Sequence, residues 1–208
     1  MRALLLSLVP FVLADVLPMP KAEAPLDLSK EVTAACGPVY QQQKVAFTFV
    51  VTVDGQEKAR RRHDWSPTGD TLRVSYEGVD VAFTHLNPPT APTATPEARD
   101  EAWAAFINDS YWLLAACKAS DQGVQHSSPD PQHLELRFDG VGLTPGDSYS
   151  MTLDSDYRVT RWDYVLQGGN TGAWTWEDYQ KVGDLWLSLT RRHVDGHKVI
   201  RFEEVEVR

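Results

Sequence analysis

The segment KVAFTFVVTV at positions 44–53, followed by Asp54-Gly55, decides the fold class of this chain. Successive side chains of an extended strand point to opposite faces, so every second residue of this segment, including Phe47 and Phe49, lies on the same apolar face. An Asp-Gly pair after such an alternation is a strong signal for a tight hairpin turn. The stretch therefore predicts an antiparallel strand pair with one buried face.

The same period of two residues recurs along most of the chain, and the segments are joined mainly by tight turns. A slip in the alternation between Phe202 and Val205 indicates a β-bulge. We expect about eleven short antiparallel strands, at 44–53, 57–65, 72–76, 79–86, 112–117, 134–138, 149–153, 160–166, 174–176, 185–189 and 200–207.

Helical signals are fewer. Asp27 can cap a short amphipathic helix that ends near Cys36, and the three prolines of 87–94 indicate a loop. Thr95-Pro96-Glu97 then provides an N-cap, a proline at the first helical position and an acid in the first turn. This helix is predicted to run to about Asn108, with one apolar stripe formed by Trp103, Phe106 and Ile107.

Eleven antiparallel strands in one small domain must curl, because strand twist accumulates and an uncovered apolar face would aggregate. The expected fold is mainly β (α+β): a curved antiparallel half-barrel with two or three helices covering its concave face. Such a hollow suits a long, flexible, water-averse ligand, and burying a sixteen-carbon chain is worth roughly 12 kcal/mol. The alternative is a hollow filled by the protein's own side chains. The candidate lining residues are Phe47, Phe49, Val51, Leu72, Val74, Trp103, Phe106, Leu136, Phe138, Met151 and Trp162.

Composition and the N-terminus narrow the function further. The chain has 208 residues and a formal net charge of −9. This charge disfavours binding to nucleic acid and adhesion to a membrane through a basic patch. Residues 1–14 combine a positive start, a short apolar run and a small residue at Ala14, as a secretory signal peptide does. We therefore expect a signal peptide at 1–14, a single domain at 15–208, and a soluble, exported protein.

The two cysteines are Cys36 and Cys117. An oxidising compartment permits a disulfide between them, which would close a loop of about 80 residues. Two free buried thiols are the alternative, because the sequence gives no distance between the two Cα atoms.

Chemical motifs are weak. His63 and Asp64 are neighbours on a strand and point to opposite faces, so we interpret this charged strand as solvated. His193 and His197 flank a turn and do not make a dedicated metal site, whereas His126 lies beside a Ser/Pro loop. We identify no catalytic residue, metal ligand or cofactor motif, and we expect no enzymatic activity. Metal in the purified protein, or an activity lost on changing His193 or His197, would instead indicate an enzyme.

The order of these elements resembles the outer-membrane lipoprotein carrier (LolA-like) superfamily over nearly the whole mature chain. The resemblance includes the segments DSYWL (109–113), GLTPGDSY (142–149) and RWDY (161–164). It implies a half-barrel that holds the acyl chains of a lipid or lipid-modified protein in the periplasm, an outer-membrane acceptor protein, and a monomer. The best-known carriers latch the lid with an arginine inside the barrel. The sequence does not place that residue, because the run 60–62 is expected to face water.

Two other binding interpretations remain open at this stage. The domain is either a structural or lipoprotein-sensing module without a transported cargo, or a carbohydrate-binding module. The second would use surface tryptophans as a stacking platform, with Trp162, Trp174 and Trp176 as the candidates.

Overall fold

The computed structural model describes residues 26–138 and 146–208 of the chain. The predicted signal peptide, 1–14, lies outside these ranges. The helices are α1 (Leu28–Cys36) and α2 (Pro96–Leu114), with 3₁₀ turns η1 (Val39–Gln41) and η2 (Ala116–Lys118). The strands are β1 (Val45–Val53), β2 (Gln56–Ser66), β3 (Thr71–Tyr76), β4 (Val79–Phe83), β5 (His85–Leu86), β6 (Pro89–Thr90), β7 (Gln125–Asp130), β8 (His133–Arg137), β9 (Ser148–Leu153), β10 (Val159–Val165), β11 (Thr171–Val182), β12 (Leu185–His193) and β13 (Lys198–Val207).

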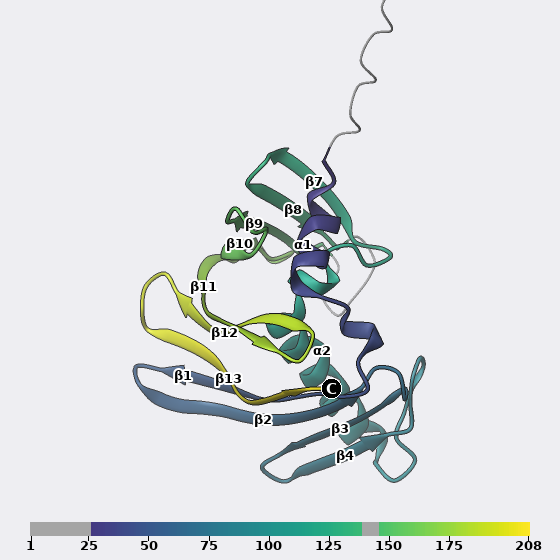
Figure 1. Ribbon diagram of the computed structural model, residues 1–208. Coiled ribbons are helices and arrows are strands. Elements are labelled where there is room, and N and C mark those ends of the chain that lie inside the picture. The colour runs from purple at the N-terminus through teal and green to yellow at the C-terminus, as the bar shows by residue number, and fades with distance from the viewer. Residues whose placement is uncertain (1–25, 139–145) are drawn as a thin grey trace, which may run out of the picture.

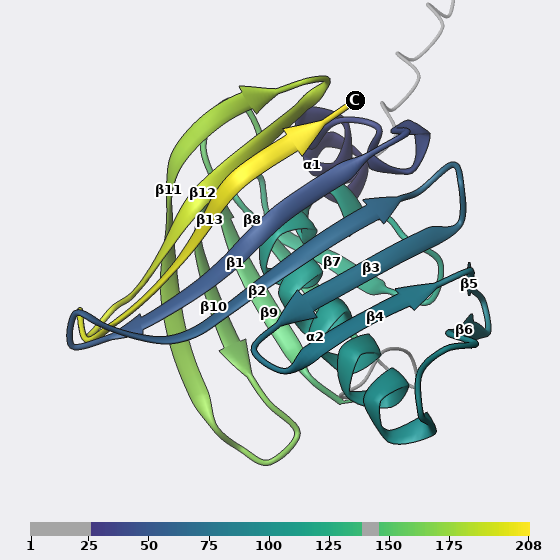
Figure 2. The same ribbon diagram turned by 90° about the horizontal axis from the view of Figure 1, so that it is seen from below.

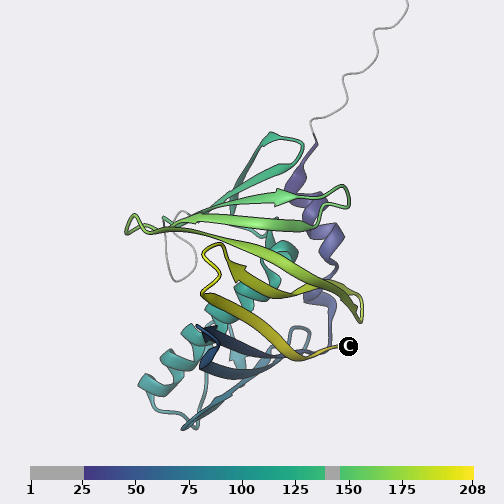
Figure 3. The same ribbon diagram turned by 90° about the vertical axis from the view of Figure 1, so that its left-hand side faces the viewer.

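Eleven of the strands form one antiparallel sheet in the order β4-β3-β2-β1-β13-β12-β11-β10-β9-β8-β7 (Figure 1). The edge strands β4 and β7 are not paired with each other, so the sheet is an open half-barrel, as predicted. Helix α2 lies inside the curve of the sheet (Figure 2), and α1 lies at the same end of the strands as the C-terminus (Figure 3). In the ranges 26–138 and 146–208, no helix is both long and apolar enough to cross a membrane.

The sheet follows the pattern of its sequence. Phe47 and Phe49 of β1 are both buried on the inward face. Asp54 and Gly55 take positive φ angles of 50° and 77°, the conformation that a two-residue hairpin turn requires. The predicted bulge in β13 is present, because two residues of β13 oppose the single residue Phe47 of β1.

Three local predictions are wrong. Residues 112–117 form the end of α2 and the turn η2 instead of a strand, because a short apolar run suits a buried helix as well as a strand. The polar segment Gln125–Asp130 forms the edge strand β7, whose six residues are all exposed and so show no alternation. The predicted loop at 87–94 contains β6, which pairs with β5 across the cis bond between Asn87 and Pro88.

A disulfide joins α1 to the chain just beyond α2. Cys36 and Cys117 are bonded, their Cα atoms are 5.0 Å apart, and they are separated by 81 positions in the sequence. The amide of Ser120 donates to the side chain of Thr33 at 3.2 Å, which adds a second connection between the same segments. The C-terminal end of α2 is therefore held against α1.

We expect the double variant Cys36→Ser/Cys117→Ser to unfold with a free energy about 2–5 kcal/mol lower than that of the native protein, because the bond restricts the unfolded chain. Urea unfolding without reductant measures this difference. Adding reductant to the native protein should move its transition toward that of the variant. Identical transitions for the variant and the native protein would contradict the expectation.

Candidate functional site

The concave face of the sheet and the helix across it form the candidate binding site. All eleven predicted lining residues lie on this side, in the apolar core or packed against it. Eight of them are buried, namely Phe47, Phe49, Leu72, Val74, Phe106, Leu136, Met151 and Trp162. The other three, Val51, Trp103 and Phe138, are partly buried.

Aromatic contacts close the space between the helix and the sheet. Trp112 of α2 stacks on Trp162 of β10 with ring centroids 5.0 Å apart and an angle of 7° between the planes. Tyr111 contacts Trp162 edge to face at 5.6 Å, and Trp103 packs on Phe83 at 5.7 Å. In the part of the chain that is described, these side chains occupy the hollow that the sequence predicted for a ligand.

Beneath α2 lies a buried carboxylate. Asp109 has no exposed surface, and both of its oxygens accept from Arg61 of β2, at 2.6 Å from Nε and 2.7 Å from Nη2. Nε2 of the buried His63 lies 2.8 Å from Oδ2, and the amide of Asn108 donates to Oδ1 at 2.9 Å. We call the three residues Arg61, His63 and Asp109 the clasp, because they tie α2 to the sheet.

The electrostatics of the clasp favour the ionised carboxylate. Burial on its own raises the pKa of Asp109, but the hydrogen bonds from Arg61 and His63 outweigh burial and leave that pKa below its ordinary value of 3.8. Replacing a buried ion pair by apolar side chains is often neutral or stabilising. A clasp of this kind is therefore better suited to fixing the position of α2 than to adding stability.

A second arginine reaches α2 from the middle strand of the sheet. Arg191 of β12 is fully buried, and its Nη2 donates to the main-chain carbonyl of Trp112 at 2.9 Å. Its guanidinium carbon lies 3.5 Å from the centroid of the Trp176 ring, and Nη1 donates to the Ser188 hydroxyl at 2.6 Å. Burial lowers the pKa of Arg191 to about 9, so the side chain stays protonated at neutral pH.

The clasp corrects the prediction that β2 is a solvated strand. Alternation turns Arg61 and His63 toward α2, whereas Arg60 and Arg62 face outward, where each lies within ion-pair distance of a glutamate. Asp64 also points away from His63, as predicted, and accepts from Arg62. The prediction was wrong for Arg61 and His63 because a charged residue can be buried when it is paired.

Asp109 and Arg191 were not identified as site residues from the sequence. Asp109 stands in the run FINDSYWLL, residues 106–114, where an acid interrupts an apolar stretch. That interruption was the available signal for a buried, paired carboxylate. Arg191 lies an even number of positions after the buried Leu185 and Leu187 of β12, so it belongs to the same face of the strand. That position was the corresponding signal for a buried cation.

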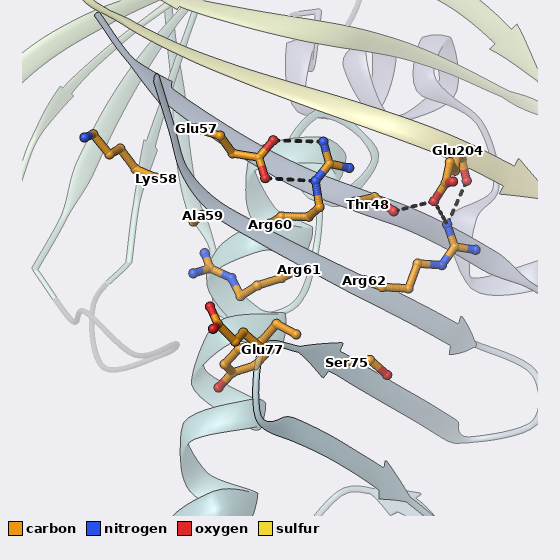
Figure 4. A pocket seen from close by; sticks show the side chains of 11 residues that line it. Thr48, Glu57, Lys58, Ala59, Arg60, Arg61, Arg62, Ser75, Glu77 and Glu204 are labelled. Carbon is orange, nitrogen blue, oxygen red and sulfur yellow. Dashed lines mark hydrogen bonds and ion pairs between the residues drawn. The ribbon is translucent and has the colours of Figure 1, made fainter. Parts of the chain in front are cut away.

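A polar cleft of about 1050 Å³ opens beside the clasp (Figure 4). It lies where β2 extends beyond the end of β3, since β2 pairs with β3 only from Arg62 onward. Arg61 lines this cleft together with Tyr76, the last residue of β3, and Glu77 from the turn that follows. The side chain of Arg61 is 24% exposed, so it connects the cleft with the buried carboxylate.

The remaining candidates do not form sites. His193 lies 2.8 Å from Asp195 and His197 lies 2.6 Å from Asp54, as expected for groups at a turn. Among the residues described, no group of three metal-binding side chains comes together. The proposed sugar platform is wrong, because at most 5% of the surface of Trp162, Trp174 and Trp176 is exposed.

Comparison with solved structures identifies the fold. A LolA superfamily protein from Nitrosomonas europaea superposes with a TM-score of 0.50, covering 87% of this chain and 92% of that one at 9% sequence identity. The fold is LolA-like. A DUF1329 family protein from Desulfovibrio piger aligns with a TM-score of 0.44 and 11% identity over 86% of this chain and 90% of that one. No protein-family model and no curated protein matches this sequence.

The clasp generates a pH prediction. Because the pKa of Asp109 is lower in the folded state than in the unfolded state, Asp109 stabilises the fold above about pH 4. This contribution is lost as the pH falls through the folded pKa. We expect the Asp109→Asn variant to be about 3–5 kcal/mol less stable at pH 7.

We also expect the unfolding free energy of the native protein to fall more steeply below about pH 4 than that of Asp109→Asn. Denaturant titrations of both proteins across this range measure the difference. Curves that run parallel with pH would show that Asp109 does not gain its charge-dependent stability from the clasp.

Proposed function

We propose that this protein is an exported, periplasmic carrier that binds the acyl chains of a lipid or of a lipid-modified protein. The chains would lie between the concave face of the sheet and α2, against the predicted lining residues. The proposal includes removal of residues 1–14 as a signal peptide and transfer of the cargo to an acceptor at the outer membrane. The LolA-like fold supports a carrier architecture, and the chemistry of the clasp supports a movable α2.

The observation that carries the proposal is an ionic clasp between a helix and a largely apolar concave face. Asp109 is buried and paired with Arg61 at 2.6 Å, although apolar packing would hold the helix at least as well. A buried ion pair fixes one geometry and can separate when a ligand replaces its interactions. When α2 moves away, the apolar face beneath it becomes available to an acyl chain.

The energetics allow such an exchange. Each acyl CH₂ removed from water contributes ~0.8 kcal/mol, so a chain of sixteen carbons offers roughly 12 kcal/mol against the loss of contacts between α2 and the sheet. Trp103 and Tyr111 of α2 are only partly buried, so part of the helix surface already lies near solvent. A lid that opens locally is consistent with this unequal burial.

A second candidate function also has a specific observation in its favour. The aromatic side chains of α2 and β10 fill the hollow, as the stack of Trp112 on Trp162 illustrates. A structural or lipoprotein-sensing domain would keep this packing permanently. Binding of an acyl chain distinguishes the two candidates.

The test uses quenching of tryptophan fluorescence by methyl dibromostearate, a neutral brominated acyl chain. We expect quenching of the native protein, and a smaller quenched fraction in Trp162→Phe because Trp162 lies on the concave face. Trp186→Phe is the matched control. Trp186 alternates with the buried Leu185 and Leu187 and packs under Arg158 at 4.2 Å, so its loss should leave the quenched fraction nearly unchanged.

The purified protein should also release lipid into organic solvent, detectable by mass spectrometry. No lipid in the extract together with no quenching would overturn the carrier proposal and favour the filled structural domain. If Trp162→Phe and Trp186→Phe reduce the quenching equally, the acyl chain binds outside the concave face.

A further inference from the structure

The two sides of the clasp carry opposite charges on separate elements. Its carboxylate, Asp109, belongs to α2, whereas Arg61 and His63 belong to the sheet. If α2 moves away to admit a ligand, the carboxylate leaves with the helix. The donors remain on the concave face.

Within the described ranges, Asp109 accepts the side-chain hydrogen bonds of Arg61, although Glu77 lines the same cleft. Among the described residues, both hydrogen bonds from the Arg61 side chain go to Asp109. The guanidinium carbon of Arg61 also lies over the ring of Phe49, 5.1 Å from its centroid. His63 has no exposed surface, and its Nδ1 already lacks a hydrogen-bond partner among the described residues. An unpaired cation beside an apolar surface is costly, so a replacement anion on Arg61 would favour the open state.

We propose that the ligand is an amphiphile whose carboxylate takes the place of Asp109 on Arg61 and His63 while its acyl chain covers the apolar concave face. This inference rests on the proposed carrier function and names the class of ligand. Nε and Nη2 of Arg61 form a fork that donates to two oxygens of one group, at 2.6 and 2.7 Å, and a carboxylate supplies two oxygens at this spacing.

The polar cleft gives such a headgroup an approach. Arg61 is part of the wall of the cleft (Figure 4). It keeps 24% of its side-chain surface exposed while it is still paired with Asp109. A carboxylate arriving through the cleft therefore meets Arg61 before α2 has moved. Exchange of one carboxylate for another can then release the helix without leaving Arg61 unpaired.

Arg191 does not play the same role. Its contact with α2 is the carbonyl of Trp112, near the C-terminal end of the helix, and the Ser188 hydroxyl and the Trp176 ring belong to the sheet, so these two stay in contact with the guanidinium wherever α2 lies. Arg191 thus keeps part of its environment in the open state, whereas Arg61 loses both of its hydrogen bonds.

The experiment compares the dissociation constants of hexadecanoate and of methyl hexadecanoate at pH 8, measured by tryptophan fluorescence. The two probes share a chain and differ in the charge of the head. We expect the native protein to bind the acid at least about tenfold more tightly, as a charge-assisted bidentate contact implies. Asp109→Asn should increase this ratio, because the competing carboxylate is removed.

Two further variants isolate Arg61. The double variant Arg61→Gln/Asp109→Asn leaves no buried charge unpaired at this pair, and its ratio should fall to about one. Arg73→Gln is the matched control, because Arg73 of the adjacent strand makes a similar bidentate pair with Asp80 on the exposed face, and this variant should keep the native ratio.

Equal affinities of the native protein for the two probes would overturn the headgroup assignment while leaving the carrier function in place. A ratio that survives in the double variant would overturn the role of Arg61. Binding of neither probe would contradict the carrier function itself, so the two failures are distinguishable.

Discussion

The arrangement of this molecule depends on one buried carboxylate. A half-barrel of antiparallel strands has an apolar concave face that must be covered, and α2 covers it. Apolar packing would allow the helix several positions, but the bidentate contact of Asp109 with Arg61 allows only one. The cost of burying that charge is offset by its hydrogen bonds only while α2 stays in place, so the position of the helix and the charge of the site are coupled.

The attachments of α2 differ along its length. Near its C-terminal end, the disulfide at Cys117 and the contact of Arg191 with the Trp112 carbonyl join it to α1 and β12. Toward its N-terminal end, it is held by the partly buried Trp103 and by a hydrogen bond of 2.9 Å between Tyr76 and Glu101. The clasp lies between these regions. This distribution favours an opening in which the N-terminal part of the helix moves and the C-terminal part stays anchored.

Much of the fold follows from local patterns in the sequence. Alternation in 44–53, the Asp54-Gly55 turn and the N-cap at Thr95 were sufficient to predict an open antiparallel half-barrel with a helix across it. Periodicity could not separate strand from helix at 112–117, where every position is apolar and the helix end is largely enclosed. The clasp was missed for a different reason. Asp109 and Arg61 are 48 positions apart, and although an acid in an apolar run indicates burial, nothing local in the sequence identifies Arg61 as its partner.

The measurement that tests this account most directly is the distance between α2 and the sheet with and without ligand. Spin labels would replace Asp100, which is exposed on α2, and Arg201, which is exposed on the outer face of β13. Double electron–electron resonance then measures the distance between the two labels. The account predicts one short distance in the free protein and a longer one when hexadecanoate is bound. A single unchanged distance at saturating hexadecanoate would contradict it, because α2 would then be a fixed part of the core.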